Sequence, residues 1–281
     1  MSNDIRPMGL RDLEVALGWA RDEGWNPGLD DAPAFHAADP DGFLMGFVGG
    51  VPVSCISVVK YDDHFAFLGL YIVRPPYRGR GLGKAIWDAG IASAGERTIG
   101  LDGVPAQQGN YRASGFALAH RSARWGGRLR GGLTPPPHVR PLTEADGQAV
   151  LAYDSAHFPA SRSTFLTQWL GRSATRQTGG FFDHSDRLRG YGSIRRCTEG
   201  WKIGPLFADT PEIADALVAS LATHAAGDRV FIDVPEPNTA ARALAERLGF
   251  TPAFETARMY RGPAPVLPLD HIFGITTLEL G

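Results

Sequence analysis

FAFLGLYIVRPPYRGRGLGKAIWDAG, residues 65–90, joins a strand pattern, a glycine-rich turn and a helix pattern. Phe65–Val73 is an almost unbroken apolar run rich in aromatic and β-branched residues, which predicts a buried strand. The prolines at 75–76 end it, because proline cannot donate to a strand ladder. From Leu82 onward apolar residues recur at helical spacing.

The turn has the chemistry of an anion-binding corner. It reads Arg78-Gly-Arg-Gly-Leu-Gly-Lys84. Glycines let a ligand approach the backbone closely, and the free N–H groups and dipole of a helix start favour phosphate. Three cationic side chains add positive charge. An ordinary glycine-rich turn after a core strand is the alternative interpretation.

Two well-known phosphate motifs do not fit this turn. A P-loop requires Ser or Thr after its lysine, and here Ala85 follows Lys84. The glycines at 79, 81 and 83 are not spaced as Gly-x-Gly-x-x-Gly. The pattern that remains is Arg-x-x-Gly-x-Gly, formed by Arg78, Gly81 and Gly83.

This pattern, after a strand ending Tyr71-Ile-Val-Arg-Pro75, resembles the acyl-CoA pyrophosphate loop of the GNAT superfamily of N-acetyltransferases. Downstream, Tyr111-Arg-Ala-Ser-Gly-Phe116 resembles the family's Tyr-x-x-x-Gly-Phe segment. The resemblance implies an α/β fold with a mixed, mostly antiparallel sheet flanked by helices. It also implies acetyl-CoA as cosubstrate and an amine of a small molecule or peptide as acceptor.

Composition sets the broad class. The chain has 281 residues, 43% of them hydrophobic, which allows one large or two ordinary domains. A net charge of −2 without a long basic run implies no nucleic-acid or membrane partner. The two cysteines, Cys55 and Cys197, and the eight histidines show no metal-ligand spacing, so no metal is expected. With no signal-like or membrane-spanning apolar stretch, we expect a cytoplasmic protein.

Local patterns predict the remaining elements of the first half. Residues 29–42 should form a loop or a short helix after a break at Gly24–Gly28. Strands are expected at 5–8, 43–48, 53–60, 98–101 and 116–125, a helix at 13–23, and a short helix or turn at 108–113.

A linker and a repeat follow. Glycine and proline are frequent at 126–132 and 135–137, which predicts a linker. Beyond it, three segments match earlier ones at one offset, 139 − 5 = 134. We therefore expect a tandem GNAT protein, with a catalytic acetyl-CoA-binding domain at 1–133 and a degenerate GNAT-like domain at 138–281. The matches are Val139–Leu142 with Ile5–Met8, Gly249-Phe250 with Gly115-Phe116, and Thr256–Arg258 with Ser122–Arg124.

The second copy has lost the motifs. At the same offset Glu212, Asp215 and Leu217 replace the loop's Arg78, Gly81 and Gly83, and Ala245 replaces Tyr111. Carboxylates at a helix start repel a pyrophosphate.

The second copy does keep Asn238, at a spacing that resembles the family's pantetheine-side asparagine. The first copy has Val104 there, with Gln107 or Gln108 as substitutes. Residues 271–280 read as a final strand that could pair with either copy's sheet.

The resemblance assigns roles around the thioester. A backbone N–H in the stretch Tyr71, Ile72 and Val73 would stabilise the oxyanion, and Tyr111 would protonate the departing thiolate. The alternative for Tyr111 is packing under Phe116. Cofactor-binding residues are expected to be Tyr71, Ile72, Val73, Arg78, Gly79, Arg80, Gly81, Leu82, Gly83 and Lys84.

The base and the acceptor site are less defined. An amine with a pKa of about 10.4 must lose a proton before it attacks. Residues 65–73 contain no acid, so Asp102 and then His64 are the candidate bases, with a water-mediated path as a third. Trp25, Asn26 and His64 are the candidate acceptor-site residues, near an acidic loop that suits a cationic amine.

The sequence is compatible with three functions. The first is an N-acetyltransferase that acts by direct attack of the amine. The second is a non-catalytic tandem GNAT scaffold that senses acyl-CoA or another ligand, which the absence of a strand acid favours. The third is transfer from a different acyl donor.

Overall fold

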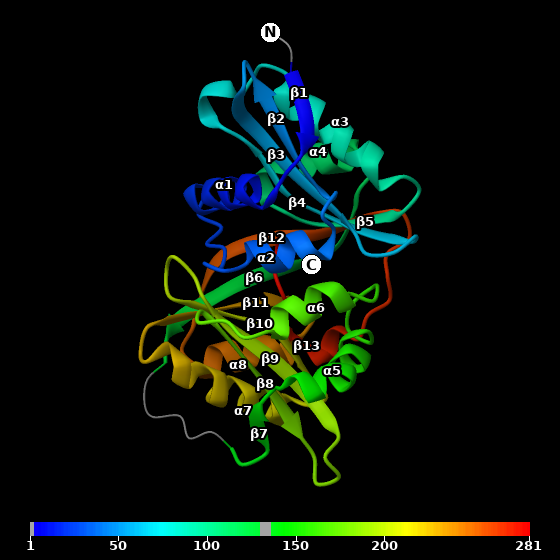
Figure 1. Ribbon diagram of the computed structural model, residues 1–281. Helices are drawn as coiled ribbons and strands as arrows, with labels where there is room; N and C mark the ends of the chain where they lie inside the picture. Colours follow the sequence, from blue (N-terminus) through cyan, green and yellow to red (C-terminus); the bar gives the residue numbers. More distant parts are fainter. Residues whose placement is uncertain (1–2, 130–135) are drawn as a thin grey trace.

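One mixed sheet runs through the whole molecule. In the computed structural model, which describes residues 3–129 and 136–281, thirteen strands belong to it (Figure 1). The first copy comprises β1 (Asn3–Pro7), α1 (Leu10–Asp22), α2 (Ala32–Ala38), β2 (Phe43–Val48), β3 (Val51–Lys60), β4 (Phe65–Val73), α3 (Leu82–Ala94), β5 (Thr98–Gly103), α4 (Gln108–Ala113) and β6 (Ala117–Arg128). The second comprises β7 (Val139–Pro141), α5 (Gly147–Asp154), α6 (Ser163–Leu170), β8 (Arg176–Phe182), β9 (Leu188–Arg196), β10 (Trp201–Ala208), α7 (Pro211–Leu221), β11 (Arg229–Pro235), α8 (Thr239–Arg247), β12 (Thr251–Arg261) and β13 (Ile272–Gly274).

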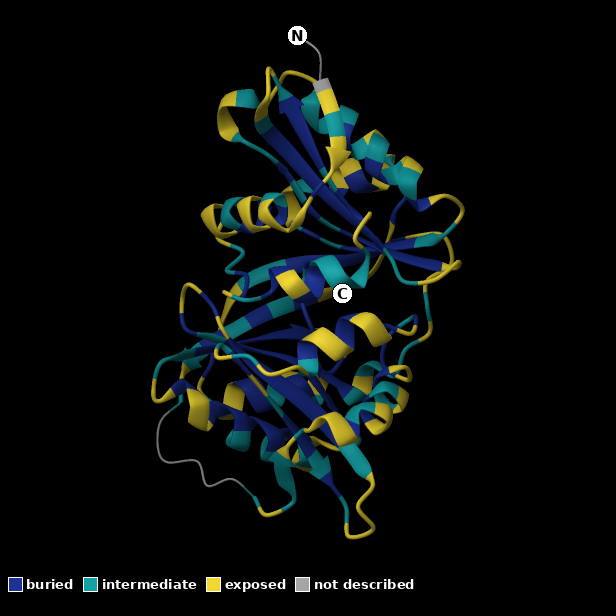
Figure 2. Cartoon of the chain, viewed as in Figure 1, coloured by how far each residue is buried: buried dark blue, intermediate teal, exposed yellow. Residues whose placement is uncertain are grey.

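Apolar patterning explains most of the first copy. Strands β2 and β4 have the bounds that the sequence predicts. Helix α1 buries Leu13, Ala16, Leu17 and Ala20 on one face. The segment expected as loop or short helix contains α2. Figure 2 shows the strands buried along the middle of both halves.

The two copies exchange a strand. The sheet order is β1-β2-β3-β4-β5-β12-β6-β11-β10-β9-β8-β7, so β12 lies beside β5 and β6 lies beside β11. In the antiparallel β6–β12 pair, Ser122 lies opposite Thr256, which is its own repeat equivalent (256 − 122 = 134). An approximate two-fold axis therefore passes between these residues. The boundary between the repeats in sequence differs from the boundary between the packed halves.

Two buried ion pairs fix the exchanged strands. Arg124 of β6 donates Nε to Asp233 Oδ1 at 2.6 Å and Nη2 to Oδ2 at 3.0 Å, across to β11. Arg258 of β12 makes the equivalent bidentate contact with Asp102 of β5, at 2.9 and 2.7 Å. The repeated Ala-Arg pattern at 123–124 and 257–258 thus has a structural cause, because each arginine neutralises an aspartate of the other copy.

The expected linker begins later than its composition suggests. Residues 126–128 belong to β6, where they pair with residues 229–231 of β11. A Cβ on Gly126 would lie 2.4 Å from the Phe231 ring, so the glycine lets that ring cover the strand. Residues 130–135 of the predicted linker lie outside the described residues.

The end of the sequence reaches both copies. The expected strand at 271–280 is regular only in β13, which pairs with β10. Residues 275–281, called here the closing segment, then cross to the first copy. There the Tyr61 hydroxyl donates to Leu280 O at 2.9 Å.

Helices α2 and α6, one from each copy, add a second contact between the halves, because Phe35 and Trp169 share one apolar cluster. No helix among the described residues has the length and apolar character needed to cross a membrane.

Candidate active site

Strands β4 and β5 diverge in the middle of the first copy. Their parallel pairing ends at Leu68 opposite Leu101. On its other side β4 carries a β-bulge, since Ser57 lies opposite Gly69 but Cys55 lies opposite Ile72, and Leu70 adopts a positive φ of 47°. The bulge turns β4 away from β5 and opens a gap between them.

One β4 amide in the gap points away from β3. The Arg74 N–H donates to Val53 O at 2.9 Å. Because successive amides of a strand point to opposite edges, the Val73 N–H faces the open side. The Val73 carbonyl, on that same side, accepts from Arg78 Nε at 2.8 Å.

The glycine-rich loop presents its backbone to solvent. Gly79 and Gly81 have φ values of 73° and 78°, and a Cβ on either would meet no atom within 4 Å. Gly81 is the N-cap of α3 and supplies no side-chain cap. Within the described part of the chain, no atom accepts a hydrogen bond from the N–H groups of residues 79–84. These amides at a helix start fit an anionic group such as a diphosphate.

The loop's cations lie at the surface. Arg78 pairs with Glu23, and Lys84 Nζ lies 2.6 Å from Asp88 Oδ2. The Arg80 guanidinium stands 5.7 Å from the centre of the Tyr77 ring. All three guanidinium or ammonium groups can reorient toward a ligand, because exposed ion pairs are weak.

An aromatic row connects the loop helix to the gap. Trp87 of α3 packs between Tyr71 and Tyr111, with ring centroids 5.1 and 5.6 Å away. Burial, and secondarily Tyr71, raises the pKa of Tyr111 above its ordinary value, so the hydroxyl keeps its proton at neutral pH. Trp87 also contacts Phe116, so Tyr111 belongs to a packed cluster as well as to the gap.

Two adjoining cavities follow the gap. Both are lined by Trp25, Tyr71, Val104 and Tyr111. The outer cavity continues to Val73 and Arg78, and so toward the loop. The inner cavity continues into the molecule, where it is lined by Leu68–Leu70, Leu101–Gly103, Phe254, Thr256, Leu278 and Glu279.

The other predicted site residues have different surroundings. Asp102 lines the inner cavity, but both its carboxylate oxygens are bound to Arg258. Asn26 bonds the backbone of Glu199 through both side-chain atoms, at 2.9 and 3.0 Å, so it joins the two copies. His64 is exposed in the turn before β4, at the opposite end of that strand from the loop. Of the expected acceptor residues, only Trp25 reaches the cavities.

Comparison with known proteins decides the family. A model of the acetyltransferase (GNAT) family matches residues 10–117, and a model of an acetyltransferase (GNAT) domain matches residues 150–274. A relative from Pseudoalteromonas sp. (strain SANK 73390), named holothin acyltransferase, is 32% identical over 277 residues, which cover 98% of this chain and 94% of the relative. This chain is a tandem GNAT acetyltransferase-family protein.

Solved structures share the tandem GNAT fold. An acetyltransferase candidate from Pyrococcus horikoshii superposes with a TM-score of 0.83 at 22% identity, covering 99% of this chain and 96% of that one. A tandem GNAT protein from the clavulanic acid biosynthesis pathway gives a TM-score of 0.65 at 17% identity, covering 94% and 100%. At these identities the likeness concerns the fold alone.

In the second GNAT copy the corresponding gap is filled by the protein. Parallel pairing of β10 with β11 ends at Ile203 opposite Ile232, and β13 then pairs with β10. The Ile275 N–H donates to Asp233 O at 2.8 Å. A Cβ on Gly204 would lie 2.2 Å from Ile275 O, so this segment is in close contact with β10.

Asn238, expected from the GNAT resemblance on the pantetheine side, holds that same segment. Its amide donates to Asp270 O at 3.1 Å and Ile272 O at 3.0 Å, and its Oδ1 caps α8. At the start of α7, Thr210 caps the helix and backbone contact lowers the pKa of Glu212, so a carboxylate occupies the anion position.

Sequence reasoning missed Phe254 and Glu279 of the inner cavity. Both come from the second GNAT copy, and no local motif marks them. Only the strand exchange and the path of the closing segment bring them to the gap. Across residues 3–129 and 136–281, no cluster of three or more His, Cys, Asp or Glu could hold a metal ion.

Proposed function

We propose that the first GNAT copy transfers an acetyl group from acetyl-CoA to an amine of a small molecule or peptide, by direct attack on the thioester. One observation carries this proposal: a row of loop amides without a hydrogen-bond partner among the described residues directly follows Arg78, which lines the outer cavity together with Tyr111. The second copy offers neither feature. The relative named holothin acyltransferase, similar over nearly the full length, supports acyl transfer as the reaction class.

The groups along the gap have separate roles in the proposed transfer. The amides of residues 79–84 bind the diphosphate. Arg78 holds the start of the loop against the end of β4, because its Nε donates to the Val73 carbonyl. The acyl group lies against the Tyr71–Val73 stretch of β4, where the Val73 N–H, on the open side, supplies the oxyanion donor. Tyr111, kept protonated by burial, gives its proton to the departing thiolate.

The loop is tested by replacing Gly81 with Glu. A carboxylate at this helix start repels a diphosphate, so acetyl-CoA affinity measured by calorimetry should fall by about 100-fold or more, equivalent to about 2.7 kcal/mol. The matched control is Gly50→Glu in the β2–β3 turn, where φ is 80° and space is equally open. If Gly81→Glu binds acetyl-CoA as Gly50→Glu does, the loop does not bind the cosubstrate.

Thiol release from acetyl-CoA separates an enzyme from a sensor. The assay uses holothin, the compound in the relative's name, and 2-phenylethylamine as probe acceptors. Release that depends on an amine supports transfer. Binding of acetyl-CoA without release from either probe supports the sensor alternative.

A further inference from the structure

Glu279 lines the inner cavity and forms no ion pair with any other described residue. Its residue is only 2% exposed, and its Oε2 is buried without a hydrogen-bond partner in the described part of the chain. The cavity around it also contains Tyr111 and the bulged part of β4. Burying a carboxylate oxygen without a hydrogen-bond partner is costly, so a cationic ligand that donates to it would stabilise it.

The neighbouring charges already have partners. Asp102 is bound to Arg258, and Arg124 is bound to Asp233. Lys202 donates to Asn26 O at 2.9 Å, and it forms no ion pair with Glu279. Glu279 forms no ion pair among the described residues; Arg124 and Lys202 lie close enough to attract it electrostatically, but both donate their hydrogen bonds to other groups.

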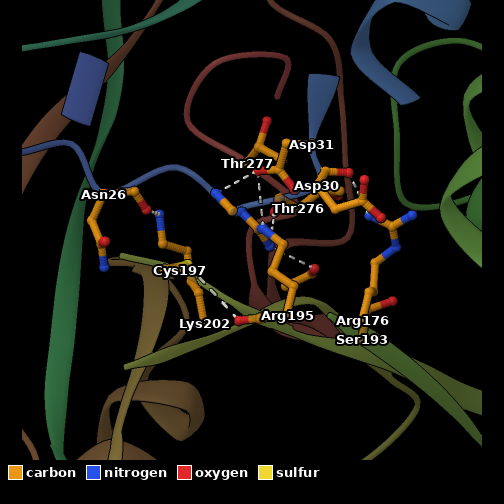
Figure 3. A network of polar contacts seen from close by, with 12 residues as sticks. Asn26, Asp30, Asp31, Arg176, Ser193, Arg195, Cys197, Lys202, Thr276 and Thr277 are labelled. Atoms are coloured by element: carbon orange, nitrogen blue, oxygen red, sulfur yellow. Dashed lines mark hydrogen bonds and ion pairs between the residues drawn. The ribbon is translucent and has the colours of Figure 1, made fainter. Parts of the chain in front are cut away.

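The closing segment is held firmly enough to position this side chain. Arg195 of β9 contacts both Asp31 of the first copy and Thr276 (Figure 3). Arg195 Nη1 donates to Thr276 O at 3.1 Å, and Tyr61 anchors Leu280 on the other side of Glu279. A Cβ on Gly69 would lie 2.1 Å from Glu279 O, so this glycine of β4 allows the segment its close approach.

We propose that Glu279 is the catalytic base of the first copy and that its acceptor is a cationic primary amine. The closing segment of the second copy thus completes the first copy's site. This inference depends on the proposed acyl transfer and deepens it. It also replaces the strand acid that β4 lacks. The aromatic walls from Trp25 and Phe254 suit an acceptor with an apolar body next to its ammonium group.

Glu279 and Tyr111 together account for every proton that moves in the transfer. Glu279 takes one proton from the ammonium group, and the neutral nitrogen attacks the thioester carbon. The C–N bond forms, the C–S bond breaks, and Tyr111 gives its proton to the thiolate sulfur. The nitrogen's second proton restores Tyr111, and the first passes from Glu279 to solvent.

The test compares Glu279→Gln with the wild-type enzyme, using 2-phenylethylamine and holothin as probe acceptors. We expect kcat/KM to fall about 100-fold or more at pH 7, within the usual range for removal of a general base. Acetyl-CoA affinity should change less than about threefold. The loss of rate at low pH expected for the wild type should be absent from the variant's pH profile.

Controls separate chemistry from folding. Glu255→Gln changes an exposed acid of β12 that pairs with Arg121, and it should leave the rate within about twofold. Glu279→Asp keeps the charge, so it should retain the low-pH limb at reduced rate. Equal rates and pH profiles for wild type and Glu279→Gln would overturn the inference while leaving acyl transfer intact. Absence of amine-dependent thiol release from the wild type would instead overturn both.

Discussion

At the residue scale, Tyr111 is the side chain to which we assign the proton donor of the proposed transfer. It lines both cavities and stacks on Trp87, and burial raises its pKa. A tyrosine that stays protonated has a proton to give to the departing thiolate, and the free thiol is mostly protonated at neutral pH because its pKa is about 8.5. The same packing explains why the residue would also stabilise the fold, so its role needs a kinetic test.

Replacing Tyr111 with Phe keeps the ring and removes the proton. We expect kcat to fall about 100-fold with acetyl-CoA affinity nearly unchanged, because the hydroxyl acts when the thiolate leaves. Steady-state kinetics and calorimetry check the two quantities separately. An unchanged kcat, or a parallel loss of affinity, would mean that Tyr111 serves packing alone.

The residues that sequence reasoning misjudged depend on partners far along the chain. Asp102 reads as an acid at a strand end, and nothing nearby shows that Arg258, 156 residues later, binds it. Glu279 carries no motif and lies in a segment that reads as a strand. The loop and Tyr111 could be proposed from the sequence because their motifs lie within a few consecutive residues.

At the element scale, the exchange of β6 and β12 determines the arrangement. Both strands carry the same Ala-Arg pattern, so either could pair with β5 or β11 by composition. Strand positions such as β2 and β4 follow from apolar runs, whereas the choice between two equivalent partners leaves no mark in the sequence. The arginine–aspartate pairs then secure the exchanged arrangement from both sides of the axis.

Breaking one of these pairs should destabilise the protein. Asp102→Asn leaves Arg258 buried without its counter-charge, which should lower the free energy of unfolding by about 3 kcal/mol. Chemical denaturation measures this change in the free energy of unfolding. The control is Glu246→Gln, which breaks the exposed contact with Arg242 and should cost less than about 0.5 kcal/mol. Equal stability of Asp102→Asn and the control would show that the pair does not hold β5 to β12.

At the scale of the whole molecule, the two copies form a single unit with divided tasks. One keeps an open gap, and the other fills its own gap with β13 and delivers the closing segment. The second copy thus supplies part of the lining of the first copy's inner cavity.

Cutting the chain after residue 133 tests this interdependence. In each fragment a long strand would lose both sheet neighbours, because β6 pairs with β12 and β11 of the other half. We expect neither fragment to unfold cooperatively alone, and co-expression to restore a one-to-one complex. Size-exclusion chromatography and thermal denaturation report both properties. A stable, monomeric fragment 1–133 would contradict the interdependence.

We propose that only the first copy binds the cosubstrate. Calorimetric titration of the full chain with acetyl-CoA tests it most directly, through the number of molecules bound per chain. We expect one molecule of acetyl-CoA per chain, and Gly81→Glu should abolish its binding. Two bound molecules per chain, or one that survives this substitution, would contradict it.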